Sequence, residues 1–171
     1  MTAQGRYLAH QTTKRETLKA IMAERHSNRR FANRPLSEDT IASLITAADL
    51  APSSCNRKAI SLTQVTARDD LALLDGVLVG GTGWIYRAPL VLLLQGDPEA
   101  YQAPGEIAYM PYLDAGHLSQ QIQLAAIAAG LHCCFVNPNV RGPNRDHFAT
   151  RFGWKVFCGA IALGHPYELQ T

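Results

Sequence analysis

The stretch Arg25-His26-Ser27-Asn28-Arg29-Arg30-Phe31 decides how the rest of this sequence is interpreted, together with the later stretch Ala51-Pro52-Ser53-Ser54-Cys55-Asn56. Guanidinium groups present a rigid fork of donors to phosphate oxygens, so Arg25, Ser27 and Arg29 suit a dianion. The second stretch offers hydroxyls, a carboxamide and loop amides, which suit a polar heteroaromatic ring. Together the two stretches indicate a site for a mononucleotide such as FMN.

Each stretch also has an ordinary structural explanation when it is taken alone. An arginine-rich helix end is commonly a solvated face that complements the helix dipole. A Pro-Ser-Ser turn is commonly a plain loop. The functional interpretation rests on their ordered pairing, because the first stretch closes one predicted helix and the second follows the next.

Size and composition restrict the possible classes of protein. A chain of 171 residues suits one well-buried core and is short for two. A net charge of +2 argues against a nucleic-acid binder driven by bulk electrostatics. No apolar run reaches the roughly 18 residues of a membrane span, and residues 1–15 carry no signal-peptide core. We expect a cytoplasmic protein that binds neither nucleic acid nor membranes.

The cysteines favour a structural role. The chain has four, none in a Cys-x-x-Cys pattern: Cys55, Cys133, Cys134 and Cys158. Neighbouring cysteines suit neither a zinc knuckle nor an easy mutual disulfide, so we expect small buried side chains in a reducing compartment and no metal. A weaker alternative is a metal site made by Cys133, Cys134, His132 and His147.

Hydrophobic periodicity divides the chain into helices and strands. Helices are expected over residues 13–26, 37–50, 68–75, 113–129 and 144–152, and strands over 59–66, 90–94, 133–136 and 156–163. The pattern Thr13-Lys14-Arg15-Glu16 fits a capping box at the first helix start, and Leu18, Ile21 and Met22 should form its buried stripe. Residues 1–12 are expected to be a flexible arm, or a segment that wraps onto a partner, and residues 13–171 a single α+β domain.

The motif Arg-His-Ser-x-Arg-x-Phe, followed about twenty residues later by Ala-Pro-Ser-Ser-x-Asn, resembles the amino-terminal signature of the FMN-dependent nitroreductase family. Three later segments are also similar to that family, and extend the resemblance over residues 14–167. They are Ala88-Pro89 before an apolar strand, Asp114-Ala115-Gly116 in the long helix, and Gly164-His165-Pro166 after the last strand.

The resemblance implies a fold and an assembly. The fold would be an α+β three-layer sandwich with a central, mainly antiparallel sheet, built as an intertwined homodimer with FMN at the subunit interface. Residues 81–84 fall where relatives often have a further flavin contact. The positions that match the cofactor-binding motifs of the family are Arg25, His26, Ser27, Arg29, Pro52, Ser53, Ser54, Asn56, Phe135, Val136 and Asn137.

The resemblance assigns these positions different tasks. Arg25, Ser27 and Arg29 would hold the phosphate and ribityl chain, with His26 beside them. Pro52, Ser53 and Ser54 would border the isoalloxazine, and Asn56 would reach it from the other subunit. The segment Phe135-Val136-Asn137 matches the one whose backbone amide faces flavin N5 in relatives.

The implied activity is hydride transfer from NAD(P)H through flavin N5 to a small planar acceptor, such as a nitroaromatic or a quinone, with ping-pong kinetics. The flavin step requires no side-chain acid, base or nucleophile, so no catalytic residue is named. Two alternatives stay open: a flavin-binding protein without turnover, and a dehydrogenase-type or flavin-modifying enzyme of the same fold.

The chain departs from the family pattern at three places. The family usually has a basic tail after the last turn, whereas no basic residue follows His165 here. Phosphate binding would then depend more on Arg25 and Arg29, with help from Arg57 or Lys58. Asn137 stands where an acidic residue is common, and the short segment before the long helix predicts an open substrate pocket.

Overall fold

The core of the protein is a four-stranded sheet between two layers of helices. The computed structural model describes residues 3–102, 107–153 and 155–167. The strands are β1 (Ile60–Val65), β2 (Leu90–Gly96), β3 (His132–Val136) and β4 (Val156–Gly164), in the spatial order β1-β2-β4-β3. Every neighbouring pair is antiparallel. The α+β class with an antiparallel central sheet is therefore confirmed, while the intertwined dimer stays a prediction.

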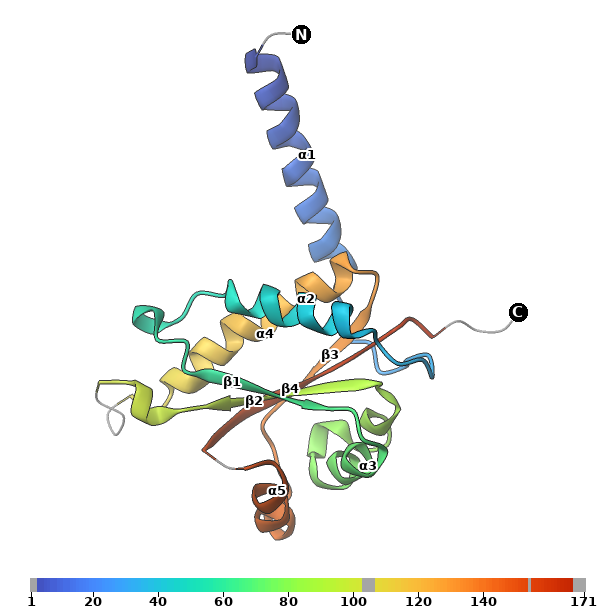
Figure 1. Cartoon of the computed structure of the whole chain (residues 1–171), viewed down its shortest axis with the longest axis vertical. Helices are drawn as coiled ribbons and strands as arrows, with labels where there is room; N and C mark the ends of the chain where they lie inside the picture. The colour runs from blue at the N-terminus through green and yellow to red at the C-terminus, as the bar shows by residue number, and fades with distance from the viewer. Residues whose placement is uncertain (1–2, 103–106, 154, 168–171) are drawn as a thin grey trace.

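Helices cover both faces of this sheet (Figure 1). Helices α2 (Glu38–Asp49) and α4 (Met110–Ala128) lie on one face, and α3 (Arg68–Val77) and α5 (Arg145–Phe152) lie on the other. Strand β2 is buried along its whole length, because its two sides face different helical layers. Leu90, Leu92 and Leu94 pack with α2 and α4, whereas Val91 and Leu93 pack with α3 and α5. A continuous apolar run is the pattern expected of a strand covered on both faces.

The predicted elements of the domain are confirmed, with small shifts at their ends. Helix α2 begins after Ser37, whose hydroxyl accepts a hydrogen bond from the Thr40 backbone N–H at 3.2 Å. Helix α4 ends at Ala128, and Gly130 follows with φ +70°, a conformation that glycine adopts at little cost. Helix α5 starts after Asn144 as expected, although the Asn144 side chain makes no capping hydrogen bond.

The prediction for the first helix is wrong at its start and in its burial. Helix α1 (Ala3–Glu24) already begins at Ala3, so residues 13–16 lie inside it and do not cap it. Figure 1 shows α1 projecting away from the rest of the domain. Leu18 and Met22 are each 50% exposed, and only Ile21 packs against the layer of α2 and α4. Whether residues 1–12 act as an arm on a partner stays a prediction.

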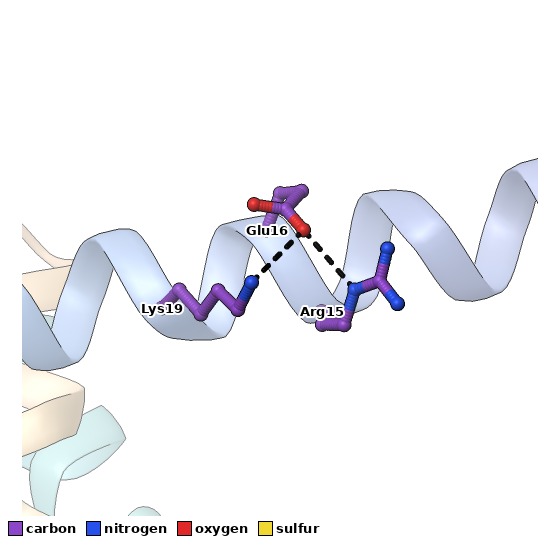
Figure 2. Close-up of polar contacts among 3 residues, drawn as sticks. All are labelled: Arg15, Glu16 and Lys19. Atoms are coloured by element: carbon purple, nitrogen blue, oxygen red, sulfur yellow. Dashed lines mark hydrogen bonds and ion pairs between the residues drawn. The ribbon is translucent and has the colours of Figure 1, made fainter.

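Glu16 forms local ion pairs on the exposed surface of α1. Figure 2 shows that Glu16 Oε1 accepts from Arg15 Nε at 3.1 Å and from Lys19 Nζ at 3.4 Å. Exposed pairs of this kind contribute about 0.5 kcal/mol or less. Such pairs stabilise α1 only locally. The domain leaves Leu18 and Met22 of this helix half exposed.

No helix within the described residues is both long enough and apolar enough to cross a bilayer.

Replacing Gly159 in β4 tests the packing of the sheet. Gly159 has φ +132°, and a Cβ there would lie 2.5 Å from Phe135 Cζ and 2.8 Å from the Val136 carbonyl oxygen. We expect Gly159→Ala to lower the free energy of unfolding in urea by about 3 kcal/mol, through overpacking and backbone strain. The control Gly76→Ala lies in α3 with nothing within 4 Å, and should be neutral or slightly stabilising. Equal midpoints of urea unfolding for Gly159→Ala and Gly76→Ala would contradict this packing.

Candidate functional site

The segment that follows α1, residues 25–29 and here called the arginine segment, lies against strand β3. Ser27 forms a parallel bridge with Cys133, and the Asn28 N–H donates to the Cys133 carbonyl at 3.0 Å. In such an extended segment, alternate side chains point to the same side. Arg25, Ser27 and Arg29 therefore share one side of the segment, and His26 and Asn28 share the other.

The electrostatic surroundings of Cys134 show that Arg25, Ser27 and Arg29 converge. Burial raises the pKa of the Cys134 thiol, and this rise is opposed by the charge of Arg29, by a hydrogen bond from Ser27 and by the charge of Arg25. Burial also raises the pKa of Cys133 to about 11, again with Arg25 opposing. The three side chains predicted to hold a phosphate thus all lie near Cys134 on β3.

Trp84 lies beside Arg29 and adds an aromatic ring to the group formed by Arg25, Ser27 and Arg29. The Arg29 guanidinium carbon lies 5.8 Å from the centroid of the Trp84 ring, a cation–π distance. Trp84 Nε1 donates to the Gly80 carbonyl at 3.0 Å, which orients the indole. Trp84 was not among the predicted site residues, although it ends the segment 81–84 that the resemblance marked for a further flavin contact.

The end of β3 adjoins the same surface. A Cβ at Gly80 would lie 3.2 Å from Val136 Cγ1 and 3.6 Å from Asn137 Oδ1, so the Gly80 turn touches this end of the strand. Val136 is buried, Phe135 half-buried and Asn137 exposed. The predicted group Phe135-Val136-Asn137 is therefore brought next to Trp84, which in turn contacts Arg29.

His26 lies in a different environment from the arginines. Its Nδ1 is 2.7 Å from the Glu24 carbonyl oxygen, and its ring centroid is 6.2 Å from that of His132. His26 and Asn28 line a separate hollow of about 420 Å³ at the end of α4. The arrangement therefore does not place the His26 ring with Arg25, Ser27 and Arg29.

The second predicted half of the site, residues 52–56 and here called the serine turn, is attached to the start of α4. Asp114, only 1% exposed, accepts from the Ser54 N–H at 3.0 Å and from the Ser54 hydroxyl at 3.1 Å. The Tyr101 hydroxyl donates to the other Asp114 oxygen at 2.9 Å. Burial, reinforced by this hydrogen bond, raises the pKa of Tyr101. Asp114 thus anchors the serine turn, a role that the sequence motif did not indicate.

The rest of the serine turn is shaped by its own backbone. Cys55, Asn56 and Lys58 all have φ near +50°, and the Ser53 hydroxyl accepts from the Lys58 N–H at 3.0 Å. Lys58 Nζ donates to the Asp49 and Ala51 carbonyl oxygens. Lys58 therefore closes the end of α2 within this chain, and the help expected from Arg57 or Lys58 at the phosphate stays a prediction. Pro52 and Asn56 are left exposed.

Within one chain the two halves lie at opposite ends of α4 (Figure 1). The serine turn is bonded to Asp114, near the helix start, whereas the arginine segment pairs with β3, which begins shortly after Ala128. A rise of about 1.5 Å per residue separates Asp114 from Ala128 by about 21 Å along the axis. A single chain therefore presents two half-sites rather than one pocket.

The alternative metal site finds no support in the arrangement of the described residues. Across the described ranges, no three His, Cys, Asp or Glu side chains gather closely enough to hold a metal ion.

Replacing Asp114 tests the anchor of the serine turn. In Asp114→Asn the amide NH₂ group replaces one acceptor oxygen and faces the Ser54 or Tyr101 donors. We expect the free energy of unfolding to fall by about 2 kcal/mol, the cost of leaving buried donors unpaired beside a lost charge. Tyr101→Phe removes a single donor and should cost about 1 kcal/mol. If chemical denaturation gives both variants the stability of the parent, the anchor is not structural.

Comparisons with known proteins agree with this arrangement. The family model described as the nitroreductase family matches residues 22–79, which contain both the arginine segment and the serine turn. No curated protein matches the chain in sequence.

Solved structures of low sequence identity share the fold. An FMN-dependent nitroreductase from Clostridium difficile R20291 is 21% identical over 88% of this chain and 88% of its own, with a TM-score of 0.73. The NfrA1 nitroreductase from B. subtilis is 19% identical over 88% of this chain and 67% of its own, with a TM-score of 0.76. A nitroreductase family protein from Clostridium novyi NT is 16% identical over 88% of this chain and 86% of its own, with a TM-score of 0.75.

The chain therefore combines a nitroreductase-family sequence segment with a nitroreductase fold, which confirms the resemblance to that family drawn from the motifs.

Proposed function

We propose that this protein is an FMN-dependent NAD(P)H oxidoreductase that reduces small planar acceptors such as nitroaromatics or quinones. The observation that carries the proposal is the pairing of the arginine segment with β3, which brings Arg25, Ser27 and Arg29 near Cys134. The neighbouring Trp84 and the end of β3 supply an aromatic ring and backbone groups. A phosphate site that adjoins a surface for a flat ring is what a flavin mononucleotide requires.

The donor set fits FMN in charge as well as in shape. Arg25 and Arg29 take part in none of the ion pairs among the described residues. No carboxylate of these pairs therefore neutralises their charge. Two guanidiniums and a hydroxyl on one side of an extended segment match the three free oxygens of a phosphate monoester. Bound FMN supplies hydride transfer from NAD(P)H to the acceptor.

The residues of this chain would bind and orient the cofactor. Arg25, Ser27 and Arg29 would neutralise the phosphate. Trp84 would hold the Arg29 guanidinium in place through the cation–π contact. The backbone of residues 135–137 would border the ring at the end of β3. Asn137 adds no charge there, so the site relies on neutral donors near the ring.

We further propose that the protein works as a homodimer whose sites are shared between subunits. The serine turn and the arginine segment lie near opposite ends of α4 in one chain, and Asp114 and Ala128 are about 21 Å apart along its axis, which is too far for one FMN to place its phosphate at the arginine segment and its ring at the serine turn. The serine turn of a second subunit would supply Pro52, Ser53, Ser54 and Asn56. The uncovered side of α1, with Leu18 and Met22 half exposed, offers apolar surface for such an interface.

The colour of the purified protein tests the activity. Protein saturated with FMN should be yellow, and anaerobic mixing with NADH or NADPH should bleach the flavin absorbance. Addition of a quinone should then restore it. Retained flavin that neither donor bleaches would favour the alternative, a flavin-binding protein without turnover or with dehydrogenase-type chemistry. Protein that stays colourless after incubation with FMN would exclude both.

Replacing both arginines tests the phosphate site. We expect Arg25→Gln/Arg29→Gln to weaken FMN binding by about a hundredfold or more, because two charge-assisted hydrogen bonds are lost. The measurement is the dissociation constant from quenching of flavin fluorescence. The matched control is Arg145→Gln, an exposed arginine at the start of α5, which should bind FMN like the parent. Unchanged affinity in the double variant would contradict the assignment.

A further inference from the structure

Two adjoining cavities on the domain are lined by arginines that the proposed flavin site does not use. The first, of about 490 Å³, is lined by Arg30, Phe31, Arg87 and Tyr167. The second, of about 430 Å³, includes Arg34, Arg68 and again Arg87 in its wall. Arg87 borders both, so the two cavities lie side by side, and together they are here called the basic groove.

The charges of the basic groove are not neutralised by the protein. Among the described residues, no Asp or Glu lines either cavity, and the described ion pairs involve none of the four arginines. The whole chain has a net charge of only +2, so four unpaired guanidiniums are a local concentration of positive charge. A cavity lined by one sign of charge focuses its potential and attracts ligands of the opposite sign.

Two of the guanidiniums are held in position before any ligand binds. Arg68 Nη2 donates to Asn33 Oδ1 at 2.6 Å, and Arg68 Nη1 donates to the Tyr86 carbonyl at 3.3 Å. Arg87 Nε donates to the Tyr86 hydroxyl at 3.0 Å, and its guanidinium carbon lies 5.2 Å from the Tyr86 ring centroid. One residue, Tyr86, thus helps to orient both arginines. Preorganised groups lose less entropy on binding and bind more tightly.

The remaining walls suit a flat, partly apolar group next to the anion. Phe31 and Tyr167 line the first cavity, and Tyr167 is 52% exposed. Leu36, Leu71 and Pro89 line the second. The two volumes fall within the range of small-molecule sites, and an exposed aromatic ring favours stacking with a heterocyclic base.

We propose that the basic groove binds a nucleoside diphosphate, with its phosphates against Arg68 and Arg87 and its base against Tyr167. Two kinds of ligand contain a nucleoside diphosphate. One is a free nucleotide such as ADP. The other is the ADP half of a pyridine dinucleotide, and this second source rests on the proposed function, in which NAD(P)H is the electron donor.

Calorimetric titration with ADP and with inorganic pyrophosphate tests the groove directly. The protein is saturated with FMN at low salt, so that the arginine segment is occupied. We expect both probes to bind the parent, and Arg68→Gln/Arg87→Gln to raise both dissociation constants by about tenfold or more. Arg145→Gln is the matched control and should bind like the parent. Equal affinities in all three proteins, or no binding of either probe at millimolar concentration, would overturn the proposal.

A second pair of substitutions separates binding from folding. The described contacts include no hydrogen bond or ion pair from the side chains of Arg30 and Arg34, so Arg30→Gln/Arg34→Gln leaves the domain intact while it removes two charges from the groove. This variant should also weaken ADP binding severalfold, and higher salt should reduce the difference. If it binds ADP as the parent does and Arg68→Gln/Arg87→Gln is merely less stable to urea, the groove is structural and the proposal fails.

Steady-state kinetics distinguish the two sources. If the donor occupies the groove, Arg68→Gln/Arg87→Gln should raise KM for NADH or NADPH with kcat little changed, and ADP should compete with the donor. If a free nucleotide is the ligand, the variant should lose ADP binding while KM for the donor stays constant. The titrations can also be made on flavin-free protein, so a failure of the proposed function leaves the test of the groove intact.

Discussion

Helix α4 is the constraint on which the arrangement of the site depends. Its first turns hold the serine turn through the buried Asp114 carboxylate, and its last turn leads into β3, which pairs with the arginine segment. A packed helix is a rigid spacer of about 1.5 Å per residue. The two half-sites therefore keep a fixed separation in one chain, which supports our proposal that a cofactor using both lies between two chains.

Polar groups in this protein fall into two classes according to their partners. Asp114 is satisfied internally by Ser54 and Tyr101, so its role is to fix the chain. The guanidiniums of Arg25 and Arg29, and those of the basic groove, have no carboxylate partner among the described ion pairs. Charge that the fold does not neutralise is available to a ligand. This difference, rather than any single motif, is the basis on which we propose which polar residues are structural and which bind a ligand.

Features that depend on local periodicity were predicted correctly from the sequence. Features that depend on contacts between distant segments were not. The apolar run at residues 90–94 and the helix start at residue 37 have a local cause, and both were predicted. Leu18, Ile21 and Met22 recur at helical spacing in α1, but periodicity cannot tell whether the same chain covers these side chains. The anchoring role of Asp114 could not be predicted either, because its partner Ser54 is 60 residues away in sequence.

The flavin content of a mixed dimer tests whether each site is shared between two subunits. One subunit carries Arg25→Gln/Arg29→Gln, and the other carries Pro52→Trp, a bulky side chain at an exposed position of the serine turn. Two affinity tags isolate the heterodimer. If each site takes its arginines from one subunit and its serine turn from the other, the heterodimer has one intact site and should bind about one FMN per dimer, while neither homodimer binds it. A heterodimer without FMN, or a chain that remains monomeric with FMN bound, would contradict the account.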